Sequence, residues 1–260
     1  MFRPRQRVGK YRIIRRLARG GFATVYEAYD TIEGIYVALK TPHKELINPE
    51  TLENFRKEIR LTAGLDHPNI LSIKTADLIE DQLVIAYHLG EESLAERMKR
   101  RISTQRILEF TEQMLDALAH AHANRIIHCD VKPDNFIIFP GNIIKITDFG
   151  IARFATQTVR ASGSGTVGYL SPEQALGKPS LKSDVFSLGL IIYEMLSKHL
   201  PEWPFDWPPP DIEKLRRKLP DYFIKWLRKA LEVNTRKRFS DAEEMQKQFE
   251  KVMARYERQK

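Results

Sequence analysis

Residues 128–135 read HCDVKPDN, and residues 147–150 read TDFG. The first segment places an acid, a cation and an amide within six residues: Asp130, Lys132 and Asn135. The second segment adds a carboxylate, Asp148, eighteen positions after Asp130. Two short motifs in this order and at this spacing are more specific than either motif alone.

The four side chains suit phosphoryl transfer from ATP. Asp130 can accept a proton from an attacking hydroxyl, and Lys132 can neutralise charge on the moving phosphoryl group. Asn135 and Asp148 supply the hard oxygen ligands that Mg²⁺ prefers, with Mn²⁺ as an alternative metal. We therefore predict Asp130 and Lys132 as catalytic residues, and Asn135 and Asp148 as metal ligands.

The two motifs resemble the pattern H-R-D-x-K-x-x-N plus D-F-G of the eukaryotic-type (Hanks-type) serine/threonine protein kinase family. Cys129 departs from the pattern, because the family has arginine there. That arginine binds a phosphate on the activation segment, so we expect a non-RD kinase whose activity does not require phosphorylation of that segment. The candidate phosphorylation sites are Thr156, Thr158, Ser162, Ser164 and Thr166, with Arg153 or Arg160 as alternative phosphate partners.

The composition is that of a soluble globular protein, with 260 residues, 42% of them hydrophobic and 29% charged. The net charge of +8 favours polyanionic partners, and basic residues gather at 97–101 and 214–218. Neither cluster contains interleaved aromatic residues, so we expect solvated faces and no nucleic-acid or membrane partner. The single cysteine is typical of a reducing, cytoplasmic setting. The oligomeric state stays open.

The first third of the chain has short runs of β-branched and aromatic residues. Such runs predict strands at 11–19, 24–29, 35–40, 70–73 and 82–87. A helix is predicted from an N-cap at Asn48, with Pro49 at its first position, to about Leu65.

Beyond Gly90 the pattern becomes mainly helical. Apolar residues at helical spacing predict helices at 104–123 and 181–197, and the second is apolar on most sides and therefore buried. Two apolar runs flank a Pro-Gly-Asn turn and predict a short hairpin at 136–146. Ser240 and Glu243 form a capping box that opens the last helix.

This order of elements resembles the two-lobed plan of the kinase family over about residues 8–255. The resemblance implies an α+β fold, with a five-stranded antiparallel N-lobe that carries one helix and a mainly helical C-lobe. We assign residues 1–260 to one protein kinase domain, with the N-lobe at about 8–85, the hinge at about 86–90 and the C-lobe at about 91–260.

The segment from Leu17 to Val25 reads LARGGFATV and stands where the family has G-x-G-x-x-G-x-V. Only the central glycine, Gly20, is kept, and Ala18 and Ala23 occupy the outer positions. Glycine lets backbone N–H groups approach phosphates closely and permits positive φ. The resemblance implies that Leu17, Gly20 and Val25 contact ATP.

Lys40 ends the run VALK and resembles the strand lysine that holds the α and β phosphates, a role that suits a compact charge on a long stem. The resemblance implies Glu58, on the predicted helix, as its partner. It also implies that Ala38 and Ile137 pack against adenine together with Val25. The remaining implied contacts are the carbonyl of Ala86 and the N–H of His88 on the purine edge, and Glu92 on the ribose.

Small-molecule kinases with a related fold share this catalytic loop, so other features must indicate the substrate. Lys132 resembles the serine/threonine-specific subgroup. Residues 165–173, GTVGYLSPE, resemble the peptide-binding end of the activation segment, and Thr166 in it is expected to hydrogen-bond near Asp130. These features imply protein substrates with serine or threonine acceptors, and autophosphorylation.

The resemblance implies three supporting roles in the C-lobe. Glu173 should pair with Arg238, and Asp184 should anchor the backbone of the catalytic loop. His128 should brace the same loop.

Two alternatives stay open. A pseudokinase that acts as a scaffold is suggested by Ala18, Ala23 and Cys129. A small-molecule kinase is suggested by the shared catalytic loop and opposed by the activation segment.

Overall fold

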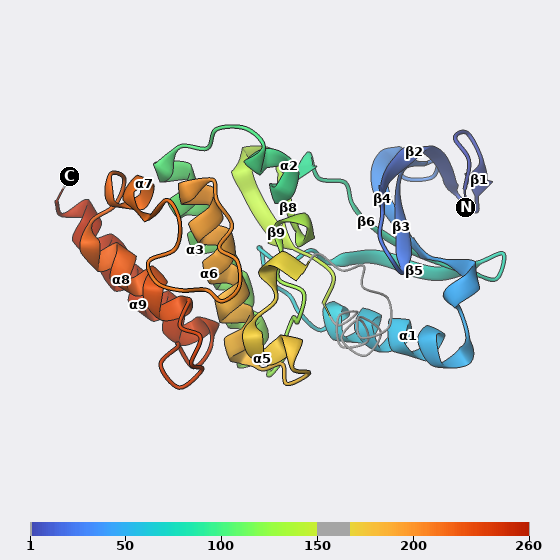
Figure 1. Cartoon of the computed structure of the whole chain (residues 1–260). Coiled ribbons are helices and arrows are strands. Elements are labelled where there is room, and N and C mark those ends of the chain that lie inside the picture. The colour runs from blue at the N-terminus through green and yellow to red at the C-terminus, as the bar shows by residue number, and fades with distance from the viewer. Residues whose placement is uncertain (1, 150–166, 260) are drawn as a thin grey trace. The chain divides into compact units, whose positions relative to one another are not determined.

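The computed structural model describes residues 2–149 and 167–259, apart from the side chains of 49–51, 54, 58 and 167 (Figure 1). Contacts divide the chain into two compact units. Unit 1 comprises residues up to 66 together with 70–91, and unit 2 comprises 67–69 together with the chain from 92 onward. The assignment of the whole chain to a single kinase domain stays a prediction. Among the described residues, no helix is long and apolar enough to cross a membrane.

Unit 1 is built on one antiparallel sheet with the strand order β1-β2-β3-β4-β6-β5 (Figure 1). Its strands are β1 (Arg7–Val8), β2 (Tyr11–Arg19), β3 (Ala23–Asp30), β4 (Ile35–Pro42), β5 (Ile73–Ile79) and β6 (Gln82–His88). The short β1 is a sixth strand beyond the five that the sequence predicts. Helix α1 (Pro49–Ala63) starts at the predicted proline and contacts β5.

The predicted strand at 70–73 is wrong, because the strand begins at Ile73 and continues to Ile79. Ile70 and Leu71 lie before the strand and are both buried, which accounts for their apolar side chains. The strand itself, β5, lies at the edge of the sheet beside β6, and most of its side chains are exposed. An edge strand of this kind does not need an apolar run, so its sequence signal is weak.

The two faces of the sheet in unit 1 differ in their surroundings. Successive side chains of a strand point to opposite faces, so Val37 and Leu39 share one face of β4 while Ala38 and Lys40 share the other. The first face belongs to a buried apolar cluster: Val8, Tyr11, Ile13, Tyr26, Ala28, Val37, Leu39, Val84 and Ala86. Lys40 therefore lies on the face opposite this core.

Unit 2 is mainly helical. Its helices are α2 (Leu94–Met98), α3 (Thr104–Ala123), α5 (Pro172–Ala175), α6 (Leu181–Ser197), α7 (Ile212–Arg216), α8 (Asp221–Ala230) and α9 (Ala242–Glu257). A three-stranded sheet of β7 (Glu92–Ser93), β8 (Phe136–Phe139) and β9 (Ile143–Ile146) accompanies them. The bounds of α3 and α6 are those predicted, and so is the β8–β9 hairpin. Helix α6 is almost wholly buried and contacts α3, α8 and α9 (Figure 1).

The last helix, α9, begins one residue later than predicted. Asp241 is its N-cap, and Asp241 Oδ1 accepts the N–H of Glu244 at 2.8 Å. The N–H of Ser240 donates to Glu244 Oε2 at 2.7 Å. The capping-box pattern, an N-cap acceptor followed three residues later by a glutamate, occurs twice here: at Ser240 and Glu243, and at Asp241 and Glu244. In the structure, the second pair caps the helix.

Candidate active site

The predicted catalytic residues Asp130 and Lys132 lie together in the loop that precedes the 3₁₀ helix η2 (Pro133–Asn135). Lys132 Nζ lies 2.7 Å from Asp130 Oδ2. Asn135 Nδ2 donates to the same oxygen at 2.9 Å and to the Asp130 carbonyl at 2.8 Å. The Asp130 side chain is 39% exposed, so the loop orients a carboxylate that an incoming hydroxyl can still reach.

Buried side chains hold the backbone of this loop. Asp184, near the start of α6, accepts the N–H of His128 at 2.7 Å through Oδ2 and the N–H of Cys129 at 2.9 Å through Oδ1. Gln174 of α5 donates its side-chain amide to the carbonyl of Cys129. The predicted anchoring by Asp184 is therefore confirmed. Cys129 has φ +64°, a left-handed conformation that costs free energy in a residue with a Cβ, so it needs such support.

His122, in α3, connects Asp184 to the last helix. Its Nδ1 accepts the N–H of Ala242, the first residue of α9, at 2.9 Å. The proton of the neutral ring is therefore on Nε2, which lies 3.0 Å from Asp184 Oδ2 and donates to it. Asp184 and His122 thus link the catalytic loop to α9 through a chain of hydrogen bonds.

The predicted bracing role of His128 is confirmed by its two ring nitrogens. Nδ1 accepts the N–H of Asp130 at 3.2 Å, so Nε2 donates to the carbonyl of Thr147 at 2.9 Å. The ring also packs against Phe149, with the ring centroids 4.7 Å apart. His128 therefore ties the HCDVKPDN loop to the TDFG segment.

Asp148 is positioned beside the catalytic loop by its neighbour Thr147. The N–H of Thr147 donates to the carbonyl of Asn135 at 2.9 Å, and its Oγ1 donates to Asp148 Oδ1 at 3.2 Å. Asp148 has φ +68°. The two predicted metal ligands, Asn135 and Asp148, are therefore held on segments that are hydrogen-bonded to each other.

The chemistry of this donor pair fits a magnesium ion. The amide nitrogen of Asn135 is engaged with Asp130, which leaves its carbonyl oxygen as the candidate ligand. One amide oxygen and one carboxylate suit an ion that keeps several waters and takes its other ligands from phosphates. Within residues 2–149 and 167–259, no group of three His, Cys, Asp or Glu side chains is arranged to hold a metal.

In unit 1, the predicted phosphate ligand Lys40 lies in the middle of the sheet. It pairs with Val25 of β3 and with Ile85 of β6, and it is only 5% exposed. A buried ammonium requires an anionic or hydrogen-bonding environment. Ala38 and Lys40 share a face of β4, so two predicted nucleotide contacts lie on the same side of the sheet. The side chain of Glu58 lies outside the described residues.

The turn between β2 and β3 is closed by the N–H of Gly20, which donates to the carbonyl of Ala23 at 2.9 Å. Gly20 does not have a positive φ, so the expected use of glycine for that conformation is not found there. A Cβ added at Gly20 would meet the Ala23 carbonyl at an ordinary 3.5 Å. Leu17 precedes this turn in β2, at a register shift between Arg16 and Ala18.

The other predicted nucleotide contacts lie at the end of β6 and in β7 and β8. The Ala86 side chain is buried in the core of unit 1, so only its backbone is available to a ligand, whereas His88 is exposed at the end of β6. Ile137 is half-buried in β8. The carboxylate of Glu92 forms an ion pair with Arg100, and a ribose contact would have to compete with that pair.

The predicted pair of Glu173 and Arg238 is confirmed. Arg238 donates to Glu173 Oε1 at 2.7 Å and to Oε2 at 3.3 Å, and it also binds the carbonyl of Lys182 at 2.7 Å. Burial alone would raise the pKa of Glu173, but the hydrogen bond and charge of Arg238 outweigh burial and hold that pKa below its ordinary value. The pair fastens α5 to the segment before α9.

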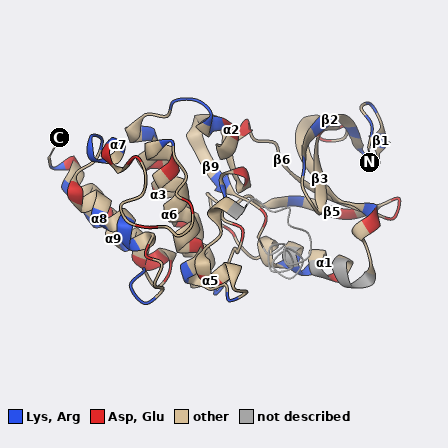
Figure 2. Ribbon diagram, in the orientation of Figure 1, with Lys and Arg blue, Asp and Glu red and all other residues tan. Residues whose placement is uncertain are grey.

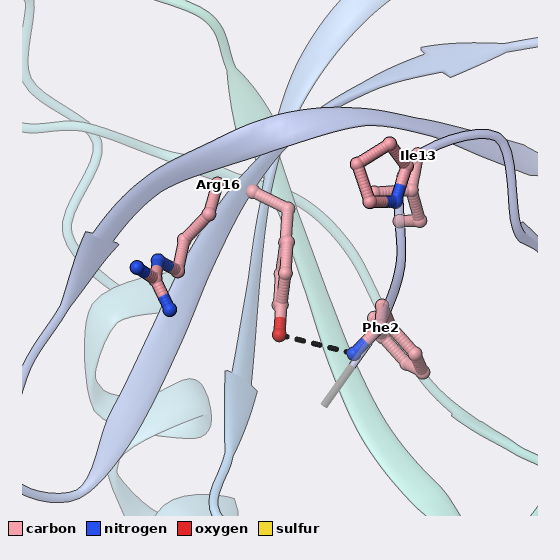
Figure 3. Close-up of a pocket in the computed structure, with 5 residues that line it drawn as sticks. Phe2, Ile13 and Arg16 are labelled. Carbon is pink, nitrogen blue, oxygen red and sulfur yellow. Dashed lines mark hydrogen bonds between the residues drawn. The ribbon is translucent and has the colours of Figure 1, made fainter.

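A pocket in unit 1 is lined by Phe2, Pro4, Ile13, Arg16 and Tyr26 (Figure 3). The N–H of Phe2 donates to the Tyr26 hydroxyl at 3.1 Å. None of these five residues is a predicted nucleotide contact, so the pocket is separate from the predicted site.

Lys and Arg residues gather in the segment after α2 and around α7 (Figure 2). Several of them form ion pairs with nearby carboxylates: Lys99 with Glu96, Arg100 with Glu92, Lys214 with Asp211 and Arg216 with Glu213. Exposed pairing of this kind is typical of solvated faces.

The predictions for the activation segment fall outside the described residues. They concern Thr156, Thr158, Ser162, Ser164, Thr166, Arg153 and Arg160.

The model of the family described as protein kinase domain matches residues 11–250, and the chain belongs to that family. It is 39% identical over 204 residues to the serine/threonine-protein kinase PrkC of Bacillus subtilis, a match that covers 74% of this chain and 31% of that protein. It is 38% identical over 240 residues to the serine/threonine-protein kinase PknA of Mycobacterium tuberculosis, covering 80% of this chain and 55% of that protein. The chain thus spans from about a third to about half of the length of these relatives.

The fold is similar to the crystal structure of the Mycobacterium tuberculosis PknI kinase domain, with a TM-score of 0.72 and 22% identity. The match covers 97% of this chain and 99% of that one. The α+β kinase fold expected from the sequence is therefore confirmed.

Sequence reasoning missed two residues that support the catalytic loop, Gln174 and His122. Gln174 contacts a residue 45 positions away, and His122 contacts one 62 positions away. No local pattern reports such contacts. The only hint for Gln174 is that it directly follows the glutamate of the S-P-E segment.

Proposed function

We propose that the chain transfers the γ-phosphoryl group of ATP to serine or threonine hydroxyls of protein substrates, including its own. The observation that carries this proposal is the Asp130 carboxylate, oriented by Lys132 and Asn135 and still accessible. The names of PrkC and PknA as serine/threonine-protein kinases support the same acceptor class.

In the proposed reaction, Asp130 orients the acceptor hydroxyl and accepts its proton as the oxygen attacks the γ-phosphorus. The bond between the γ-phosphorus and the β,γ-bridging oxygen breaks, and ADP leaves. Lys132, whose Nζ is already 2.7 Å from Asp130, stabilises the negative charge on the transferring group. The protein forms no covalent bond in this reaction, so most of the acceleration is positional and electrostatic.

Asn135 and Asp148 would hold Mg²⁺ or Mn²⁺, which neutralises charge on the phosphates. Lys40 is the proposed ligand of the phosphates, and Glu58 is the proposed ion-pair partner that holds Lys40 in place. The proposed contacts of the rest of the nucleotide are Leu17, Gly20, Val25, Ala38, Ala86, His88, Glu92 and Ile137. The burial of Lys40 on the face of β4 that also carries Ala38 supports this assignment.

We also propose that phosphorylation of the activation segment is not obligatory, because Cys129 has no side-chain donors that could bind a phosphate as arginine does. The test compares phosphatase-treated protein with untreated protein. We expect both to have similar kinase activity, and a large loss of activity after dephosphorylation would refute this part of the proposal.

One experiment separates the proposal from its alternatives. Purified protein is incubated with Mg²⁺, labelled ATP and either a peptide library or a metabolite mixture, with Asp130→Asn as the control. Label on serine or threonine of peptides, absent with the variant, supports the proposal. Label on metabolites alone indicates a small-molecule kinase, and no label in either arm indicates a pseudokinase.

A further inference from the structure

We propose that Gln174 is a positioning residue for Asp130. With Asp184, its side-chain amide holds the backbone of Cys129 in the left-handed conformation that directs the Asp130 carboxylate. The kinetic consequence rests on the proposed kinase function, whereas the structural consequence can be measured without any activity.

The peptide group between Cys129 and Asp130 is held at both of its polar ends. Its carbonyl accepts the Gln174 amide, and its N–H donates to His128 Nδ1 at 3.2 Å. Because a peptide group is planar, these two contacts fix the orientation of the whole group and of the bond that leads to the Asp130 Cα. Asp184 holds the N–H on the other side of Cys129 at 2.9 Å. Removal of the Gln174 amide takes away this hydrogen bond to the carbonyl.

Burial makes the Gln174 donor hard to replace. Gln174 is 4% exposed and Cys129 is 7% exposed, so water has little access to the carbonyl if the amide is removed. Loss of a hydrogen bond at a buried carbonyl destabilises the closed conformation of the loop relative to more open ones.

The helix that carries Gln174 is itself anchored. Ser171 Oγ accepts the N–H of Gln174 at 3.4 Å and caps α5. The preceding residue, Glu173, forms an ion pair with Arg238, with 2.7 Å between Glu173 Oε1 and the guanidinium nitrogen. Gln174 therefore connects an element fastened to the body of unit 2 with the backbone next to Asp130. This connection places Gln174 in a positioning role rather than a purely packing role.

Cys129 provides a direct probe, because it is the only cysteine in the chain and its alkylation reports on this loop. We compare Gln174→Met with Gln246→Met, since methionine keeps the unbranched stem but lacks the N–H donor. Gln246, in α9, donates to Asp116 and serves as the matched control. With iodoacetamide under native conditions, Gln174→Met should be labelled at least about tenfold faster than the wild type, and Gln246→Met at the wild-type rate.

Two results would overturn the proposal: equal labelling of Gln174→Met and the wild type, or equal acceleration in both variants. If Gln174→Met does not fold, Gln174→Glu takes its place, because it keeps the size and polarity but sets an acceptor against the carbonyl. Urea unfolding of each variant is measured alongside, so that global unfolding is recognised.

Kinetics give a second readout that a loss of packing would not produce. The kcat of Gln174→Met should fall about tenfold or more, while its KM for ATP stays within about twofold, because only the orientation of Asp130 changes. An unchanged kcat with a raised KM contradicts the proposal. A wild type without transfer activity would refute the proposed function, and the alkylation rates would still decide the role of Gln174.

Discussion

Buried polar side chains at a few positions hold the candidate site together. Asp184 accepts two backbone N–H groups and the His122 ring, and Arg238 binds Glu173 and backbone carbonyls. Each of these groups would leave an unsatisfied partner if it were removed, and an unsatisfied buried group costs about 1–3 kcal/mol. Single substitutions of these residues should therefore lower the free energy of unfolding by a measurable amount.

The pair of Glu173 and Arg238 should make stability depend on pH. Because Arg238 holds the folded pKa of Glu173 below its ordinary value, the pair stabilises the fold at neutral pH and loses its contribution as the pH falls through that lowered pKa. At pH 7, Glu173→Gln should lower the free energy of unfolding by about 3 kcal/mol, since Arg238 keeps a buried charge without its partner.

Urea unfolding at pH 7 and at pH 3 measures this difference. The gap between the wild type and Glu173→Gln should narrow at the lower pH. The matched control is Glu243→Gln, which removes the exposed pair with Lys247 and should change stability by less than about 1 kcal/mol. If the difference in free energy of unfolding were the same at both pH values, the stabilising role of the Glu173–Arg238 ion pair would be contradicted.

The turn glycine Gly20 should affect nucleotide binding more than stability. Its φ is not positive and an added Cβ makes only an ordinary contact, so Gly20→Ala should shift Tm by less than about 3 °C. A methyl group that hinders the approach of phosphate should raise KM for ATP about fivefold, which corresponds to about 1 kcal/mol. Thermal melts and initial rates measure the two effects, and an unchanged KM would remove Gly20 from the proposed site.

The elements of the fold differ in how clearly the sequence predicts them. Helices α3 and α6 are long and have apolar residues at helical spacing, so their bounds were predicted. The edge strand β5 is mostly exposed, and a preceding buried segment carries the apolar residues that mimic a strand. Helix α9 has two candidate capping pairs in adjacent registers, and the sequence pattern alone does not choose between them.

The residues of the candidate site also differ in how clearly the sequence predicts them. The motif residues Asp130, Lys132 and Asn135 are close in sequence and are brought together by their own loop. Gln174 reaches this loop from α5, and only the folded chain reveals its contact. Long-range hydrogen bonds leave no periodic pattern in the sequence, which is why this contact was not predicted.

The N-cap of α9 provides a test at the scale of the element. Asp241→Ala removes the acceptor for the N–H of Glu244 and should lower the free energy of unfolding by about 1 kcal/mol. Ser240→Ala leaves that acceptor in place and should have a smaller effect. Chemical denaturation of both variants measures the two changes in free energy of unfolding. A larger decrease for Ser240→Ala would show that Ser240, not Asp241, is the N-cap.

Each of the two units has its own framework, the sheet with its apolar core in unit 1 and the buried helix α6 in unit 2. The family match extends over residues 11–250 and therefore includes residues of both units. The proposed nucleotide contacts are likewise drawn from both, with Lys40 in unit 1 and Asp148 in unit 2.

Binding of nucleotide should stabilise the folded chain by linkage. A non-hydrolysable ATP analogue with Mg²⁺, at a hundred times its Kd, should add about 2.7 kcal/mol to the free energy of unfolding. Lys40→Met should reduce this gain strongly at the same ligand concentration, because it removes the proposed phosphate ligand. Denaturation with and without the analogue measures both values, and equal gains for the two proteins would exclude Lys40 from the site.

The most direct measurement is the single-turnover rate of phosphoryl transfer from MgATP to a serine or threonine peptide, for the wild type and Asp130→Asn side by side. Loss of a general base should slow transfer by a factor of about 10²–10⁴ while nucleotide binding, followed by calorimetry, is retained. Equal transfer rates for the two proteins, or no transfer by the wild type, would contradict the assignment of Asp130 as the proton acceptor.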